Sequence, residues 1–235
     1  RGIQSCPLET WGDRIIRTGG LVATNTPEEP AHLVSLKTVE WYDPITRQWS
    51  SLPDMPSGRS SHDTAVIGSN LHVLGGWMLD ADTGARTWYE DVWTLDLEQP
   101  EEGWTASDAP FKRRAMASVA IDGKVMVLGG MTPDGTVRQV DLFDPMDGSW
   151  ITGPEFPQQG FGIAADTVDG RVVATGSDGG VLSWRPGDTS WTLEGTTTYP
   201  RFFHQVAGDR HGDLYVIGGM CGGVRPSQIE RVPLG

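Results

Sequence analysis

Three arginines stand at equivalent places in the chain, each a few residues before a short apolar run rich in β-forming residues. They are Arg59, Arg113 and Arg201, and the first and last begin the pattern Arg-x-x-His that ends at His62 and His204. A guanidinium group binds a carboxylate or phosphate through two parallel hydrogen bonds. One hypothesis is therefore an anion site. The alternative is that each arginine pairs with backbone or a nearby carboxylate, and that the histidines are hydrogen-bonded structural residues.

The residue pattern gives little support for metal binding, nucleophilic catalysis or phosphate binding by a loop. No set of His, Cys and Asp has the spacing of a metal site. Asp80, Asp82 and Gly84 resemble a calcium loop weakly, but glycine stands where a fifth-position oxygen ligand is needed. No nucleophile motif or phosphate-cradling loop is present. We predict no catalytic residue, no metal and no cofactor. Cys6 and Cys221 form no disulfide framework, and whether they pair depends on geometry.

The charge balance narrows the classes of partner. The chain has 18 Lys and Arg residues against 31 Asp and Glu residues, a net charge of −13. Nucleic-acid binders need a basic surface that displaces counterions from phosphates, so this class is not expected. No apolar run approaches the roughly 20 residues that span a bilayer. Composition leaves the compartment and the oligomeric state open.

The elements that position these residues form a repeat. An apolar run ended by two glycines occurs at 71–76, 125–130 and 214–219, with rougher copies at 14–20 and 171–177. Five copies indicate a repeat protein. Each copy holds a short strand, a turn, the strand that ends in glycines, an alternating third strand and, except in the last copy, a fourth strand. Four short strands joined by turns predict one antiparallel sheet for each repeat.

Glycines and tryptophans recur at fixed places in these repeats. A glycine pair at a strand end permits positive φ and close backbone approach. An indole in the fourth strand buries a large area and suits the packing of one sheet on the next. The residues to which we assign these structural roles are Gly19, Gly20, Gly75, Gly76, Gly129, Gly130, Gly218, Gly219, Trp49, Trp104, Trp150 and Trp191.

This pattern resembles the kelch repeat, in which four apolar residues and Gly-Gly precede an aromatic near a proline or turn, and then a tryptophan. The aromatics are Tyr42, Phe143 and Trp184. The Arg-x-x-His segments also match the family. The resemblance implies an all-β fold, a kelch-type β-propeller of four-stranded blades around a channel.

We expect one propeller domain over residues 1–235. Its five visible blades are expected at 2–55, 59–109, 113–155, 160–197 and 201–235. The last blade lacks its outer strand. The chain is therefore expected to form either five blades closed by an upstream strand or part of a larger propeller.

The resemblance also places the candidate site. It puts the arginines and histidines named first near the channel mouth, and it puts the loops that follow the glycine pairs on one face. The loops at 21–36 and 77–90 are long, and long loops on rigid scaffolds often carry binding, although they are also tolerated without a function. The loop residues we favour are Trp77, Trp88, Tyr89 and His32. We expect a non-enzymatic module that binds a protein or glycan, chiefly through blades 1 and 2.

Two enzymatic alternatives also come from resemblance. The segment 201–204 is similar to the Arg-x-Tyr-His of copper radical oxidases, but Phe203 and Ile3 stand where that family has its two tyrosines. Neither side chain can bind copper or carry a radical. The second alternative is a sialic acid mutarotase-like enzyme, which would bind an anionic sugar through the three arginines. No carboxylate partner for such a site is identifiable from the sequence, and a binding module is favoured over an enzyme.

Overall fold

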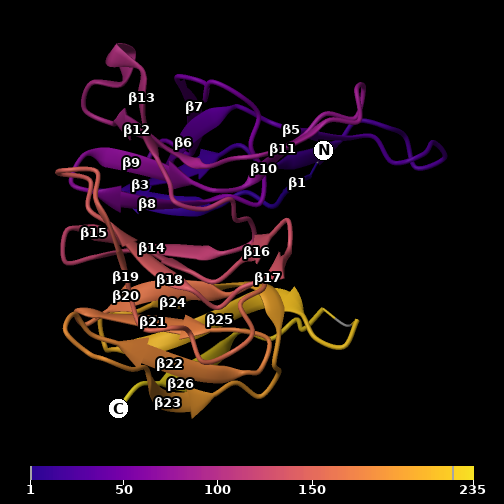
Figure 1. Ribbon diagram of the computed structural model, residues 1–235. Helices are drawn as coiled ribbons and strands as arrows, with labels where there is room; N and C mark the ends of the chain where they lie inside the picture. The colour runs from indigo at the N-terminus through magenta and orange to yellow at the C-terminus, as the bar shows by residue number, and fades with distance from the viewer. Residues whose placement is uncertain (1, 224) are drawn as a thin grey trace. The chain divides into compact units, whose positions relative to one another are not determined.

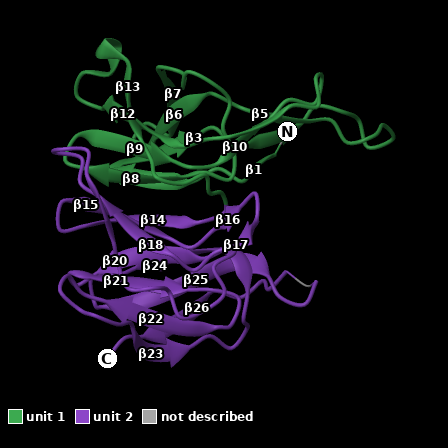
Figure 2. Cartoon of the chain, in the orientation of Figure 1, with its two compact units in different colours: residues 1–114 green, residues 115–235 purple. Residues whose placement is uncertain are grey.

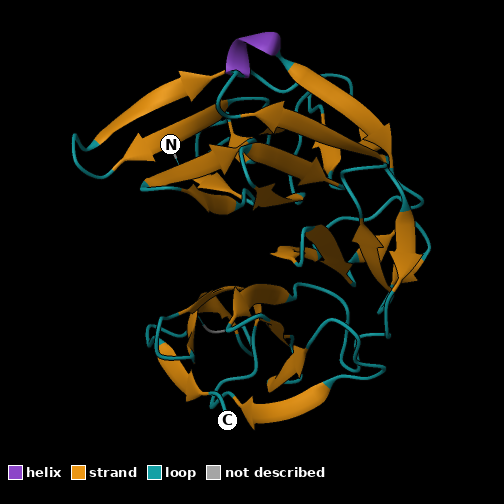
Figure 3. Cartoon of the chain, turned by 90° about the vertical axis from the view of Figure 1, so that its left-hand side faces the viewer, coloured by secondary structure: helices purple, strands orange, loops and turns teal. Residues whose placement is uncertain are grey.

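The computed structural model describes residues 2–223 and 225–235. It consists of short β-strands joined by turns and loops (Figure 1, Figure 3). The one helical segment in that part of the chain is a 3-10 turn, η1, at Pro100–Glu102. The all-β prediction is therefore confirmed.

The strands form five antiparallel sheets in chain order, four of them four-stranded and the last three-stranded. The first sheet contains β2 (Leu8–Trp11), β3 (Arg14–Thr18), β6 (Val39–Asp43) and β7 (Gln48–Leu52). The second contains β8 (Asp63–Ile67), β9 (Asn70–Leu74), β12 (Asp91–Asp96) and β13 (Trp104–Asp108). The third contains β14 (Ala117–Ile121), β15 (Lys124–Leu128), β18 (Val140–Phe143) and β19 (Trp150–Thr152). The fourth contains β20 (Ala164–Val168), β21 (Arg171–Thr175), β22 (Gly180–Trp184) and β23 (Thr192–Thr196). The fifth contains β24 (Phe202–Gly208), β25 (Asp213–Met220) and β26 (Glu230–Pro233).

Three further small sheets involve the loops that follow the glycine pairs. In the first repeat, β4 (Leu21–Ala23) pairs with β5 (Leu33–Ser35) and with β1 (Ile3–Gln4). In the second, β10 (Trp77–Leu79) and β11 (Arg86–Trp88) form a hairpin, as do β16 (Met131–Thr132) and β17 (Gly135–Thr136) in the third. The long loops that follow the glycine pairs are therefore partly ordered by strand pairing.

The chain divides into two compact units, residues 1–114 and residues 115–235 (Figure 2). Unit 1 holds the first two sheets and the β4–β5 and β10–β11 hairpins, and unit 2 holds the other three sheets. A single domain over residues 1–235 stays a prediction.

Adjacent sheets within a unit pack through alternate residues of their second strands. In unit 1, Ile16 of β3 shares a buried cluster with Leu71 and Val73 of β9. In unit 2, Met126 of β15 shares a cluster with Val172 of β21. Side chains of a strand alternate between the two faces of its sheet. In the fourth sheet, the middle one of unit 2, Val172 of β21 packs toward the third sheet and Val173 toward the fifth, so that β21 is buried on both faces, which explains its apolar sequence.

The glycine pairs allow one sheet to approach the start of the next. Gly129 has φ +57°, and a Cβ atom added there would lie 2.7 Å from the carbonyl oxygen of Gly160 and 2.7 Å from Cδ1 of Ile163. The following residue, Gly130, donates its N–H to that same oxygen at 2.7 Å. A side chain at residue 129 would therefore collide with the fourth sheet and push it away.

Two of the four repeat tryptophans join neighbouring sheets by a hydrogen bond. Trp104 donates its indole N–H to the carbonyl oxygen of Pro53 at 3.1 Å, and Trp191 donates to that of Pro154 at 3.0 Å. In each case the proline follows the last strand of the preceding sheet. Trp49 of the first sheet is instead 48% exposed, with its ring against Tyr42 of the same sheet.

Candidate functional site

Arg59 is a fully buried cation whose partners all belong to unit 1. Its guanidinium donates to the carbonyl oxygen of Gly75 at 3.0 Å and forms an ion pair with Asp91. It also lies over the rings of Tyr89 and Trp93, 4.0 and 3.9 Å from their centroids. Aromatic faces and a carboxylate compensate the charge in this buried position. No surface of Arg59 is left for a ligand.

The other two arginines of the repeat are also buried. Arg201 donates to the carbonyl oxygens of Tyr199 and Gly218 at 3.1 and 2.9 Å, and it pairs with Glu230 at 3.2 Å. Arg113 lies over the ring of Phe111, 3.8 Å from its centroid. This geometry favours the alternative in which each arginine pairs locally. Their assignment to a ligand site stays a prediction.

The two repeat histidines are buried at contacts between sheets. The Nε2 atom of His62 lies 2.7 Å from Oγ1 of Thr18, the last residue of β3. Burial, and then the charge of Arg59, lower the pKa of His62 well below its usual 6.5. Burial, and then Arg201, lower the pKa of His204 to about 4. Both rings are therefore neutral at physiological pH, and a role in packing accounts for their placement.

The favoured loop residues divide into two groups. Tyr89 faces inward: its hydroxyl donates to the carbonyl oxygen of Gly58 at 3.0 Å, and its ring packs on Arg59 and Trp93. Trp77 and Trp88 are half-buried register partners in the β10–β11 hairpin, with ring centroids 5.6 Å apart. We therefore separate Tyr89, which supports the fold, from the two tryptophans.

A cation completes the surface at the two tryptophans. The guanidinium of Arg114 lies 4.2 Å from the ring centroid of Trp77 and 5.3 Å from that of Trp88. Burial, and then the charge of Arg86, lower the pKa of Arg114 below its ordinary value. Arg114 thus lies on the Trp77–Trp88 pair at the base of the hairpin, and Arg86 lies two residues from Trp88 on β11, in the strand pair next to the turn. We call Trp77, Trp88, Arg86 and Arg114 the Trp–Arg cluster.

Sequence analysis missed both arginines of this cluster. Arg114 follows Arg113 at a place where the other Arg-x-x-His repeats have Ser60 and Phe202. The signal that could have identified Arg114 is that the other repeats have no cation at this position. Arg86 lies in a segment that was predicted as a loop, and no local pattern indicates that it comes near residue 114.

The β10–β11 hairpin is held against the long loop of the first repeat. The N–H of Leu79 donates to Oγ of Ser35, the last residue of β5, at 2.9 Å. Nε2 of His32 lies 3.0 Å from a carboxylate oxygen of Asp82. Figure 1 shows β5, β10 and β11 side by side at one end of unit 1. His32 therefore connects two loops, and the pair of loops forms one supported surface.

In the described part of the chain, metal-binding side chains form no cluster and the cysteines are not paired. No group of three or more His, Cys, Asp or Glu side chains there is arranged to hold a metal ion. Cys6 and Cys221 are both free thiols. Across residues 2–223 and 225–235, no helix has the length and apolar character needed to cross a membrane.

Comparison with known proteins gives the class of the fold. The solved structure of YjhT superposes with a TM-score of 0.76 over 97% of this chain and 80% of that chain, at 15% sequence identity. With repeated four-stranded sheets packed face to face within each unit, this similarity defines a β-propeller of the kelch type.

Sequence relatives identify the family. The Kelch motif model matches residues 19–56 and 112–157. Human Kelch-like protein 33 is 32% identical over 57% of this chain, Kelch-like protein terF of Aspergillus terreus is 25% identical over 78%, and alpha-scruin of Limulus polyphemus is 26% identical over 92%. The chain thus carries kelch motifs, and these relatives support the kelch-repeat family. It spans 25%, 39% and 24% of the lengths of these three relatives.

Proposed function

We propose that this chain is a non-enzymatic protein-binding propeller that uses the Trp–Arg cluster of the β10–β11 hairpin as its contact surface. The observation that carries the proposal is the stacking of Arg114 on Trp77 and Trp88. Tryptophan and arginine are the residues most enriched among those that dominate protein interfaces. A guanidinium already held on aromatic faces loses little freedom when a partner binds.

The charge of the cluster indicates the kind of partner. Arg86 and Arg114 form a local basic surface in a chain with a net charge of −13. The tip of the same hairpin is acidic, with Asp80 and Asp82. A carboxylate on a partner segment would be attracted to Arg86 and Arg114 and repelled by the two aspartates of the turn. We therefore favour an acidic protein segment over a glycan.

The anionic-sugar enzyme gains no support from the geometry of its expected residues. Arg59 has no exposed surface, and Arg113 and Arg201 are each 1% exposed. A sugar carboxylate would have to displace Asp91 from Arg59 or Glu230 from Arg201. The displaced carboxylate would lose its partner, and this loss opposes binding of the sugar.

The test is quantitative affinity purification followed by binding measurements with the purified partner. The variant Arg86→Ala/Trp88→Ala removes the accessible half of the cluster and leaves Tyr89 in place. We expect it to bind at least tenfold more weakly and with a smaller dependence on salt, because Arg114 remains. Trp49→Ala is the matched control, because Trp49 is an exposed tryptophan outside the hairpin. Unchanged partner sets and affinities in the double variant, with normal thermal stability, would contradict the proposal.

A further inference from the structure

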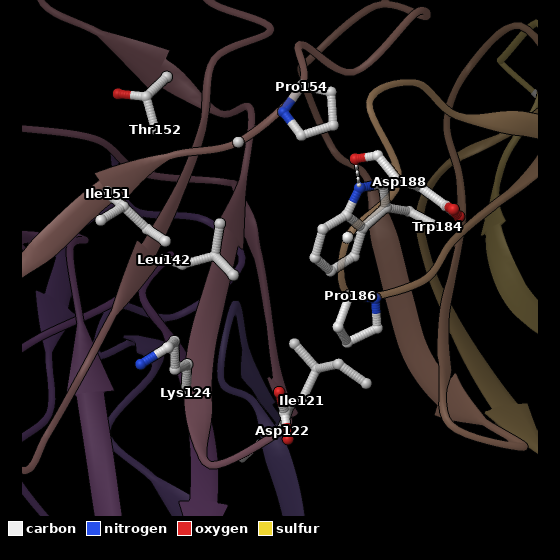
Figure 4. A pocket seen from close by; sticks show the side chains of 12 residues that line it. Ile121, Asp122, Lys124, Leu142, Ile151, Thr152, Pro154, Trp184, Pro186 and Asp188 are labelled. Atoms are coloured by element: carbon white, nitrogen blue, oxygen red, sulfur yellow. Dashed lines mark hydrogen bonds between the residues drawn. The ribbon is translucent and has the colours of Figure 1, made fainter.

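A cavity of about 280 Å³ opens between the third and fourth sheets, entirely within unit 2 (Figure 4). Its residues come from the β14–β15 turn, from β18 and β19, and from the turn between β22 and β23. These turns lie at the ends of the sheets opposite to the glycine pairs. The cavity shares no residue with the Trp–Arg cluster, and no sequence pattern predicted it.

The walls of the cavity are apolar and fixed in place. Ile121 and Leu142 of the third sheet face Trp184 and Pro186 of the fourth (Figure 4). Ile121, Leu142 and Trp184 are buried in the core of unit 2. The indole N–H of Trp184 donates to the carbonyl oxygen of Asp188 at 2.9 Å, which orients the ring. A ligand would thus meet a preformed apolar surface with no unpaired donor on the indole.

An exposed isoleucine extends this apolar surface outward. Ile151 of β19 lines the cavity and is 55% exposed. Pro154, three residues further along the chain, also lines the cavity. Apolar side chains left exposed around an apolar hollow are typical of a docking surface.

The charge around the cavity is acidic. Asp122 and Asp188 line it and are exposed. Lys124 also lines it, but its ammonium group forms an ion pair with Asp144. Hydrogen bonding and the charge of Asp144, then the charges of neighbouring aspartates, raise the pKa of Lys124. The lysine charge is therefore already compensated, and the two lining carboxylates are available to a cation.

One other cation lies near the cavity. Arg185 precedes Pro186 and donates from its guanidinium to the carbonyl oxygen of Asp169 at 3.0 Å. The backbone N–H of Arg185 donates to the carboxylate of Asp188 at 2.9 Å. The guanidinium is thus held toward the β20–β21 turn, so it leaves the acidic character of the cavity in place.

We propose that this cavity binds one large apolar side chain, aromatic or long aliphatic, from a protein partner whose adjacent residue is a lysine or arginine. The volume supports a single anchor residue, because pockets for drug-sized molecules occupy roughly 300–1,000 Å³. The two aspartates provide the charge complementarity that selects a basic neighbour. The proposal is independent of the function assigned to the Trp–Arg cluster, because the two surfaces share no residue.

The experiment uses short synthetic peptides as probes and the whole chain as the binding protein. Three fluorescein-labelled peptides differ only at their centre, which reads Lys-Trp-Lys, Lys-Ala-Lys or Glu-Trp-Glu. Fluorescence anisotropy measures their affinities at low and at moderate salt. Isoleucine methyl NMR locates the binding, with Ile151 and Ile121 reporting on the cavity. Ile45 serves as an internal reference, because it is highly exposed in unit 1.

We expect the Lys-Trp-Lys peptide to bind at least tenfold more tightly than either other peptide and to shift the Ile151 and Ile121 signals. Ile151→Glu should weaken its binding at least tenfold, and Asp122→Asn/Asp188→Asn several-fold. Ile45→Glu should have no effect. Equal affinity for the Lys-Ala-Lys peptide would mean that charge alone drives binding, and it would overturn the proposal. So would unchanged binding to Ile151→Glu, or absence of saturable binding.

Discussion

Thr18 and His62 form a polar contact, with 2.7 Å between Oγ1 and Nε2, across the boundary between the first and second sheets. The equivalent place between the fourth and fifth sheets has Thr175 and His204, both buried. Between the third and fourth sheets it has Leu128 and Ile163, which belong to one apolar cluster. The repeat position thus holds a histidine where the facing residue of the preceding sheet is a threonine. It holds an isoleucine where that facing residue is a leucine.

This relationship predicts that substitutions at residues 18 and 62 are tolerated better together than singly. Thr18→Val removes the hydroxyl and leaves His62 buried without this partner, which should cost about 1–3 kcal/mol of stability. The double variant Thr18→Leu/His62→Ile copies the pair found at residues 128 and 163, and it should be close to the parent protein in stability. Chemical denaturation of the parent, of Thr18→Leu, of His62→Ile and of the double variant gives the coupling energy.

Additive effects in this cycle would contradict the pairing. The control is Thr46→Val in an exposed turn of the first sheet, because its hydroxyl is not part of the contact between sheets. That substitution should change the stability by no more than about 0.5 kcal/mol.

The buried histidines predict a loss of stability in mild acid. The pKa values of His72 and His204 are about 4, and that of His62 also lies well below 6.5. Below pH 6.5 the unfolded chain takes up protons that the folded rings do not. Stability is therefore fully present above about pH 6.5 and falls as the pH is lowered toward 4, by about 1.4 kcal/mol per pH unit for each histidine.

Thermal or denaturant unfolding between pH 7.5 and 5 measures this slope. Between pH 6.5 and 5, His204→Gln should reduce the slope of stability against pH by the contribution of one histidine. Above pH 7, the slopes of variant and parent should coincide. A slope that His204→Gln leaves unchanged in the acidic range would show that this ring is protonated in the folded protein.

The glycine pairs predict two distinct costs of adding a side chain. Gly129→Ala combines φ +57° with a Cβ atom 2.7 Å from the oxygen of Gly160, and it should lower stability by more than about 3 kcal/mol. Gly123→Ala is the matched control, because Gly123 has φ +71° and no atom within 4 Å of the added Cβ. It should cost only about 1–2 kcal/mol. Similar melting temperatures for the two variants would refute the close approach at Gly129.

Tryptophan to phenylalanine substitutions at equivalent positions of two repeats should have different effects on stability. Trp191→Phe removes the donor to Pro154 in a buried place and should cost about 1–3 kcal/mol. Trp49→Phe alters a ring that is 48% exposed and should change stability by less than about 0.5 kcal/mol. Equal losses in denaturation experiments would indicate that Trp49 is also packed against another sheet.

Much of the fold was predictable from residues 71–76 and their copies. Apolar runs with strand period, turn residues and a terminal glycine pair are local properties, and together they indicate antiparallel sheets in a repeat. The hairpin β10–β11 was not predictable, because its strands are short and only Met78 and Leu79 add to its apolar character beside the tryptophans.

Local patterns in the sequence indicate the kelch repeat, the order of the sheets and the places of the glycines, because each depends on residues close together in the chain. Which side chains can contact a ligand or partner depends on the folded chain. Arg59 and Tyr89 appear available in the sequence, but they contact each other inside unit 1. Arg114 and Trp88, and likewise Ile121 and Trp184, are brought together by pairing and packing of distant strands. Burial and such long-range contacts depend on the whole fold, so no local pattern of residues specifies them.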